Sequence, residues 1–151
     1  MAEFEVTIRA ADEEDFDSWL VMWQAYCEFY GEAVAEKVSR ATWRRALDPG
    51  QPIHCLIAVD DAGYAIGFAV YVTHACTWST GDVGYLEDVF VAPEARCRGV
   101  ARRLIEHLRG LGRSAGWFRL YWHTERDNHA ARSLYDKLTD GATMVRYEMR
   151  L

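Results

Sequence analysis

The sequence predicts an α/β (α+β) fold in one domain spanning residues 1–151, built on a mixed, mostly antiparallel sheet. Short runs with strand-like patterns recur between longer stretches with helical spacing. Three strands follow one another in the middle of the chain, whereas the later strands are separated by helices. We therefore expect antiparallel pairing in the middle and parallel neighbours later. A length of 151 residues suits one domain.

In the first half of the chain, apolar residues recur with strand spacing in some segments and with helical spacing in others. Residues 4–9 alternate between apolar and polar side chains, as a half-buried strand does. Asp12 is a suitable N-cap, apolar residues then recur every three or four positions, and Gly31 is a suitable stop. The elements expected here are a strand at 4–9, helices between Asp12 and Gly31 and over 33–47, and strands at 53–59 and 64–74 joined by the turn Asp60–Gly63.

Strands and helices alternate in the second half. Pro93 closes one strand, and the apolar series from Val100 to Leu111 has helical spacing. The elements expected here are a loop at 77–84, strands at 85–91, 117–123 and 142–150, and helices at 99–114 and 128–138. The complete order is β-α-α-β-β-β-α-β-α-β.

Composition narrows the class of function. Half of the residues are hydrophobic, so a full core can form, while the net charge of −6 argues against general nucleic-acid binding. The charge is uneven: residues 1–36 hold ten acidic side chains and one basic one, and residues 96–113 hold six arginines and one acid. An acidic surface is compatible with a cationic substrate.

Targeting and metal-binding signals are missing from the sequence pattern. The chain shows no secretory signal and no run near the roughly 20 apolar residues of a membrane span. Its four cysteines form no C-x-x-C pair or disulfide framework, and its histidines lack metal-ligand spacing with them. We expect a cytoplasmic protein with no membrane partner and no metal.

The most informative segment is Arg96–Ala101, which lies between a predicted strand and a predicted helix. Backbone N–H groups at a helix start lack intrahelical partners, and with the helix dipole they form an anion site. Gly99 permits close approach of a phosphate, and Arg96, Arg98 and Arg102 can add charge-assisted contacts to it. The segment is neither a Walker A loop nor a G-x-G-x-x-G fingerprint.

Three motifs together resemble the GNAT acetyltransferase superfamily. They are the R-x-x-G-x-A pattern of Arg96–Ala101, the strand YLEDVFV at residues 85–91, and LYWHTERDNHAARSLYDKL at residues 120–138. The last two are similar to the branch of histone and D-amino-acid acetyltransferases. The resemblance implies acetyl-CoA as co-substrate, a homodimer, and the GNAT fold with six to seven strands and about four helices.

The resemblance also implies how the cofactor would be held. The loop and first helical turn would bind its diphosphate, the strand backbone would pair with its pantetheine arm, and the N–H of Val89 would polarise the acetyl carbonyl. The implied cofactor-binding residues are Val89, Phe90, Val91, Arg96, Cys97, Arg98, Gly99, Val100, Ala101, Arg102 and Asn128.

Acetylation of an amine requires a proton acceptor for the ammonium form and a proton donor for the leaving thiolate. Glu87 and Asp88 are adjacent strand residues, so they face opposite sides of the sheet unless a bulge intervenes. The resemblance favours Glu87 as the acceptor and Tyr135 as the donor. Either acid could instead attract a cationic substrate. Tyr30 and Trp78 are predicted to border the acceptor site together with Glu87.

The function expected from these residues is transfer of the acetyl group from acetyl-CoA to a primary amine of a small molecule, such as a polyamine or amino acid, by direct attack in a ternary complex. Two alternatives remain. The acceptor could be a lysine or N-terminus of a protein or peptide, or the chain could be a non-catalytic acetyl-CoA-binding module.

Overall fold

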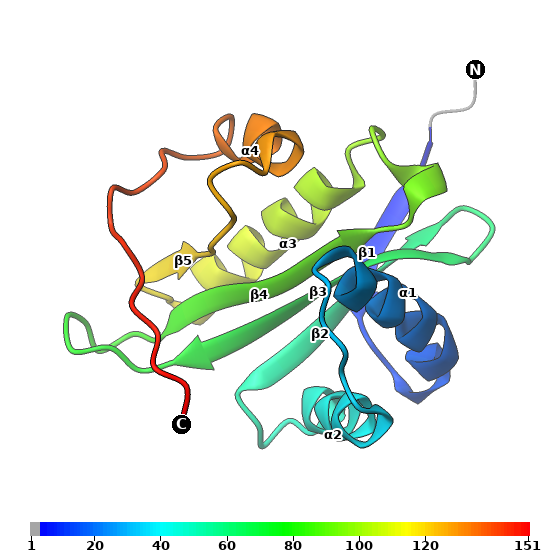
Figure 1. The fold of residues 1–151 in the computed structure, drawn as a ribbon, viewed down its shortest axis with the longest axis horizontal. Helices are drawn as coiled ribbons and strands as arrows, with labels where there is room; N and C mark the ends of the chain where they lie inside the picture. The colour runs from blue at the N-terminus through cyan, green and yellow to red at the C-terminus, as the bar shows by residue number, and fades with distance from the viewer. Residues whose placement is uncertain (1–3) are drawn as a thin grey trace.

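The computed structural model describes residues 4–151, and its sheet has five strands in the order β1-β2-β3-β4-β5 (Figure 1). The first four strands pair antiparallel with their neighbours, and β4 and β5 pair in parallel. The mixed, mostly antiparallel sheet predicted from the sequence is therefore confirmed. The strands are β1 (Val6–Ala10), β2 (Ile53–Asp60), β3 (Ala65–His74), β4 (Val83–Val91) and β5 (Arg119–Tyr121).

Helices cover both faces of the sheet, and residues 4–151 form four α-helices, in agreement with the roughly four predicted. On one face α1 and α2 pack through aromatic side chains, with Trp19 and Phe68 fully buried. On the other face α3 packs through an apolar stripe that includes Leu104 and Leu108. The helices are α1 (Phe16–Phe29), α2 (Glu36–Leu47), α3 (Val100–Ala115) and α4 (His129–Tyr135), with 3₁₀ turns at Glu13–Asp15 and Pro93–Ala95. None of these helices is long and apolar enough to cross a bilayer.

Several elements are shorter than the sequence pattern predicts. The strand expected at 117–123 is limited to β5, since β5 pairs with β4 over only three residues, Val83–Tyr85. The helix expected over 128–138 ends at Tyr135 and continues as tight turns, in which Lys137 and Leu138 each donate to the carbonyl three residues earlier. The helix expected from residue 33 begins at Glu36, because Ala35 is extended.

The strand predicted at residues 142–150 is wrong, and the sheet has five strands rather than six to seven. The segment makes no backbone hydrogen bond to any other described residue, and its side chains are exposed. Apolar and polar residues do alternate along this segment. Alternation shows that one face is suited to burial, but it does not determine whether another strand pairs with the segment. The consequence for the sheet is that β5 remains an edge.

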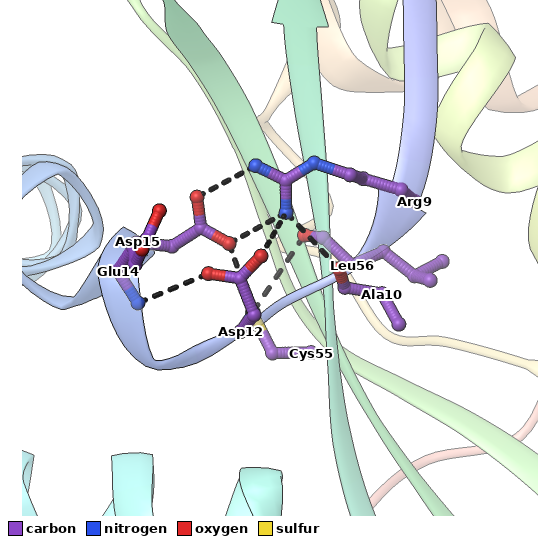
Figure 2. A network of polar contacts seen from close by, with 7 residues as sticks. All are labelled: Arg9, Ala10, Asp12, Glu14, Asp15, Cys55 and Leu56. Carbon is purple, nitrogen blue, oxygen red and sulfur yellow. Dashed lines mark hydrogen bonds and ion pairs between the residues drawn. The ribbon is translucent and has the colours of Figure 1, made fainter.

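A polar network fixes the start of α1 against β1 (Figure 2). Asp12 and Asp15 form a capping box: the Asp12 carboxylate accepts from the 3₁₀ turn, and the Asp15 carboxylate accepts from the Asp12 N–H at 2.9 Å. Arg9, at the end of β1, donates two hydrogen bonds to Asp15 at 2.6 and 2.8 Å. This bidentate pair joins strand and helix. The capping box confirms Asp12 as an N-cap, although it caps the 3₁₀ turn that leads into α1.

Replacing Asp15 with asparagine should lower the free energy of unfolding by about 2 kcal/mol at pH 7, since it leaves the Arg9 guanidinium without its carboxylate. Hydrogen bonding to Arg9 holds the pKa of Asp15 below its ordinary value. A lowered pKa contributes stability that is present above about pH 4 and is lost as the pH falls through the folded-state value. Urea titrations at pH 7 and pH 3 measure both effects, with exposed Glu14→Gln as control. Equal stabilities of the Asp15→Asn variant and the parent at pH 7 would contradict the assignment.

Candidate active site

A gap between two parallel strands forms the centre of the site. β4 and β5 are paired only where Val83–Tyr85 meets Arg119–Tyr121. Beyond Tyr85, the edge of β4 that faces β5 has no strand partner among the described residues, although β4 continues to Val91. The backbone of Val89–Val91 therefore lies along an edge that an extended chain-like ligand could pair with.

A β-bulge at Glu87 decides which acidic side chain turns inward. Val70 of β3 is opposite Asp88, but its neighbour Tyr71 is opposite Leu86, so Glu87 is the extra residue. Leu86 is buried in the core beneath α3, while Asp88 turns to the face that carries α1. Glu87 is exposed. The predicted pair of acids is thus separated into one exposed and one shielded carboxylate.

Asp88 lies beside Tyr26 of α1 and Tyr30, which directly follows α1. Burial raises its pKa to about 6, and Glu87 adds to this rise, whereas hydrogen bonding with Tyr26 opposes it. Burial and then Asp88 raise the pKa of Tyr26 and, more weakly, of Tyr30. The carboxylate therefore faces hydroxyl groups that stay protonated at neutral pH, and it titrates close to the pH at which a general base works best.

Tyr135, the last residue of α4, lies near Tyr26 and Tyr30. Its ring packs edge-on against Trp122, with ring centroids 5.4 Å apart. Burial raises the pKa of its hydroxyl, and the neighbouring Tyr30 adds to the effect. Tyr135 also contributes to the raised pKa of Tyr26, so α1, β4 and α4 bring their polar groups together. Tyr135 thus lies near Tyr26 and Tyr30, the two tyrosines beside Asp88, and its protonated hydroxyl is a suitable proton donor for the same site.

The loop before α3 has the backbone conformation of an anion site. Cys97 and Gly99 adopt left-handed conformations, with φ of 61° and 80°. A Cβ on Gly99 would meet no atom within 4 Å, so glycine is required there for its conformation and not for space. α3 starts without a side-chain cap and without an acidic residue in its first turn. Its first N–H groups are consequently free for a phosphate.

The predicted loop residues differ in which of their groups are free to bind a phosphate. Arg96 donates from Nε to the carbonyl of Val91 at 2.9 Å, which ties the loop to β4. Arg98 lies 4.7 Å over the ring of Phe4. Val100 is buried in the core, so only its backbone faces the loop, whereas Arg102 is exposed. Of the three arginines predicted to contact the cofactor, Arg102 therefore has the side chain most free to bind a phosphate.

Two predicted residues have other surroundings. Asn128 caps α4: its carbonyl oxygen accepts from the Ala131 N–H at 3.3 Å and its amide donates to Thr124 at 3.2 Å. Trp78 is 82% exposed in the loop between β3 and β4. Asp88 lies five residues into β4 from Val83, about 17 Å along the strand, so the structure does not bring Trp78 to the carboxylate.

Tyr26 lies beside Asp88 although it is not among the site residues predicted from the sequence. Tyr26 precedes Tyr30 by one helical turn on α1, with ring centroids 4.9 Å apart. The i, i+4 spacing of the two tyrosines was the available signal, because it places both hydroxyls on one helix face. Tyr30, by contrast, was predicted and lies in the cluster.

A second group of aromatic rings lies where β4 and β5 are still paired. Tyr85 and Tyr121 stack with centroids 4.9 Å apart. Each ring hydroxyl is hydrogen-bonded to a histidine, Tyr85 to His123 at 3.2 Å and Tyr121 to His74 at 2.9 Å. Tyr85 pairs with Val72, which shares a sheet face with Val70 opposite Asp88. These rings therefore extend the Asp88 face towards the open end of the sheet.

Comparison with known proteins agrees with this geometry. Residues 19–139 match the profile of the "Acetyltransferase (GNAT) family". The chain is 32% identical to "D-amino-acid N-acetyltransferase HPA3" of Saccharomyces cerevisiae over 98% of its own length and 92% of that protein. It is similar to the crystal structure of a probable acetyltransferase (TM-score 0.85, 25% identity, 96% and 97% of the two chains). It also matches the aminoglycoside N-acetyltransferase AAC(6')-Iy, solved with CoA (TM-score 0.81, 22% identity, 99% and 98%).

Proposed function

Because the chain belongs to the GNAT family and is an acetyl-CoA-dependent N-acetyltransferase, we propose that it acetylates the primary amine of a small molecule by direct attack in a ternary complex. The observation that carries this proposal is the placement of Asp88 and three tyrosines beside the unpaired edge of β4. The site thus has an acid–base pair next to a backbone edge. A relative acts on D-amino acids and a similar structure on aminoglycosides, both small amines.

Acetyl-CoA supplies an activated thioester that an uncharged amine can attack. In the proposed arrangement, the N–H groups that begin α3 and the side chain of Arg102 bind its diphosphate. The free edge at Val89–Val91 pairs with the pantetheine arm, and the N–H of Val89 donates to the acetyl oxygen as charge develops there. Gly99 keeps the left-handed turn that aims the helix start at the phosphates.

Asp88 accepts the proton of the attacking amine in this proposal. It is the shielded carboxylate, with a pKa raised to about 6, whereas Glu87, the acceptor favoured by the sequence, is exposed at the bulge. Glu87 then serves to attract a cationic acceptor, or acts as the base through a water molecule as the alternative. The Tyr135 hydroxyl donates a proton to the departing sulfur and regains one from solvent.

Turnover of an acceptor panel tests the proposal. Release of CoA is measured with D- and L-amino acids, an aminoglycoside, spermidine and a lysine-containing basic peptide. We expect at least one small amine to give a kcat/KM more than 10-fold above that of the peptide. Gly99→Val is the control, and it should raise the KM for acetyl-CoA with every acceptor.

The other outcomes correspond to the two alternatives. A peptide that is acetylated faster than every small amine would make the chain a protein acetyltransferase. Tight binding of acetyl-CoA without turnover of any acceptor would make it a binding module. Either result would overturn the small-molecule proposal.

A further inference from the structure

An open groove lies between the start of α1 and one side of α2 (Figure 1). Its volume is about 350 Å³, within the range of sites that hold a small molecule. Among residues 4–151, two aromatic rings and three basic side chains line the groove, and no acidic side chain does. The lining residues are Phe16, Lys37, Arg40, Trp43 and Arg44.

The basic side chains reach the groove because of their spacing on α2. Lys37, Arg40 and Arg44 follow one another at i, i+3 and i+7, which places them on one face of the helix. Arg40 is paired with Glu36 at 2.7 Å. Lys37 and Arg44 form no ion pair with any residue between 4 and 151. The groove therefore carries positive charge that no paired carboxylate neutralises, although the whole chain has a net charge of −6.

The aromatic rings give the groove a preformed apolar wall. Trp43 is 5% exposed and packs on Trp19 in the core, with ring centroids 4.9 Å apart. Phe16 is half-buried beside it, with its ring centroid 5.9 Å from that of Trp43. The Arg40 guanidinium lies 5.1 Å over the Phe16 ring, where its ion pair with Glu36 holds it. An aromatic ligand would extend this stack, because aromatic rings and guanidinium groups both pack well against flat partners.

The groove is separate from the candidate active site. None of its lining residues belongs to the loop before α3 or to the cluster around Asp88. Phe16 precedes Tyr26 by ten positions on α1, which corresponds to about 15 Å along the helix. The stacked rings of Trp19 and Trp23 lie on α1 between these two residues. A ligand in the groove would therefore leave the proposed places of acetyl-CoA and of the amine acceptor free.

We propose that this groove is a second binding site, for a small aromatic anion: a planar ring that bears a carboxylate, sulfonate or phosphate group. The ring packs against Phe16 beside Trp43, and the anionic group accepts charge-assisted hydrogen bonds from Lys37 and Arg44. A neutral aromatic compound lacks the charge, and an inorganic anion lacks the ring. Each should therefore bind more weakly than a molecule that has both.

Calorimetric titration of the full-length chain with 2-naphthoate tests the proposal. It is done with and without saturating CoA and needs no turnover, so its outcome is independent of the proposed enzymatic function. We expect one site per chain, with the same affinity in both conditions. 2-Naphthalenemethanol and sulfate should each bind at least about 10-fold more weakly. Absence of binding at 1 mM 2-naphthoate would overturn the proposal, as would competition by CoA, or equally tight binding of the neutral compound or of sulfate.

Two neighbouring arginines provide the matched control. Arg44 lines the groove, whereas Arg45 is exposed on α2 but does not line it. Arg44→Gln should raise the dissociation constant of 2-naphthoate at least about 10-fold, and Arg45→Gln, with the same loss of charge, should change it less than about 2-fold. Equal effects of the two variants would indicate general electrostatic attraction and overturn the site. Because both side chains are exposed, thermal unfolding of the two variants should match that of the parent.

The position of the ligand is measured independently by nuclear magnetic resonance of the tryptophan indoles. We expect 2-naphthoate to shift the indole resonance of Trp43 more than those of Trp117 and Trp122, which pack on the opposite face of the sheet. Nuclear Overhauser effects should also connect the ring protons of the ligand with those of Phe16. Larger shifts at Trp117 or Trp122 would place the ligand elsewhere and overturn the proposal.

Discussion

Replacing Asp88 with asparagine should lower kcat/KM for the best amine acceptor by at least about 100-fold, the range in which a positioned general base contributes. Asparagine has nearly the same shape and can still accept from Tyr26, but it cannot take a proton from the amine. The parent should lose activity below about pH 6, where Asp88 becomes protonated. The variant should lack that acid limb, and profiles of kcat/KM against pH measure both effects.

The same substitution should stabilise the protein. The folded-state pKa of Asp88 is raised to about 6, above an unfolded value of about 3.9. Between these values the folded chain binds a proton that the unfolded chain does not, so stability falls as the pH rises from about 4 to about 6 and stays lower above. Asp88→Asn removes this cost and should raise the free energy of unfolding by about 1–2 kcal/mol at pH 7.5, as measured with urea.

Glu87→Gln is the matched control for both effects. Its side chain is exposed at the bulge, so we expect little change in stability and a smaller loss of kcat/KM, mostly through the KM of a cationic acceptor. If Glu87→Gln removed the acid limb while Asp88→Asn kept it, the proton acceptor would be Glu87. That result would restore the assignment that the sequence favours.

The choice between Glu87 and Asp88 shows where sequence patterns stop being informative. The strand that carries both acids is evident from its apolar residues, and it is confirmed as β4. Which acid faces the helices depends on the register shift between Val70 and Tyr71 of a different strand. A bulge is a property of two paired strands, so neither sequence predicts it alone.

The loop before α3 illustrates the opposite case. Its features are local: a strand end, a glycine and the start of an amphipathic helix all lie within ten residues. Gly99 was expected to permit close approach of a phosphate, and the structure adds that it adopts a left-handed conformation, with φ of 80°. The arginines were less predictable, since Arg96 and Arg98 contact Val91 and Phe4, which lie elsewhere in the chain.

Helical spacing alone could not distinguish core residues from site residues on α1. Trp19 and Tyr26 both follow that period, yet Trp19 is buried among aromatic rings while Tyr26 lies against Asp88. Period places a residue on the inner face of a helix but does not say which part of the sheet lies beneath it. The C-terminal segment fails for a related reason, because its alternation predicts a buried face without identifying the strand that pairs with it.

Replacing Tyr135 with phenylalanine should lower kcat by about 100-fold while the dissociation constant of acetyl-CoA changes less than 3-fold. The ring and its packing on Trp122 remain, so only the hydroxyl is lost. If proton donation to sulfur limits the rate, the solvent deuterium isotope effect on kcat should also change. Stopped-flow release of CoA and calorimetric titration measure these quantities.

Tyr30→Phe is the control for the loss of a hydroxyl. Tyr30 lies in the same cluster but is 47% exposed, and the proposed proton path does not include it. We therefore expect less than a 5-fold change in kcat for Tyr30→Phe. Unchanged kcat in Tyr135→Phe, or equal losses in the two variants, would remove Tyr135 as the donor and leave a water molecule to protonate the sulfur. Burial raises the pKa of Tyr135, so its hydroxyl stays protonated throughout the neutral range, as a proton donor must.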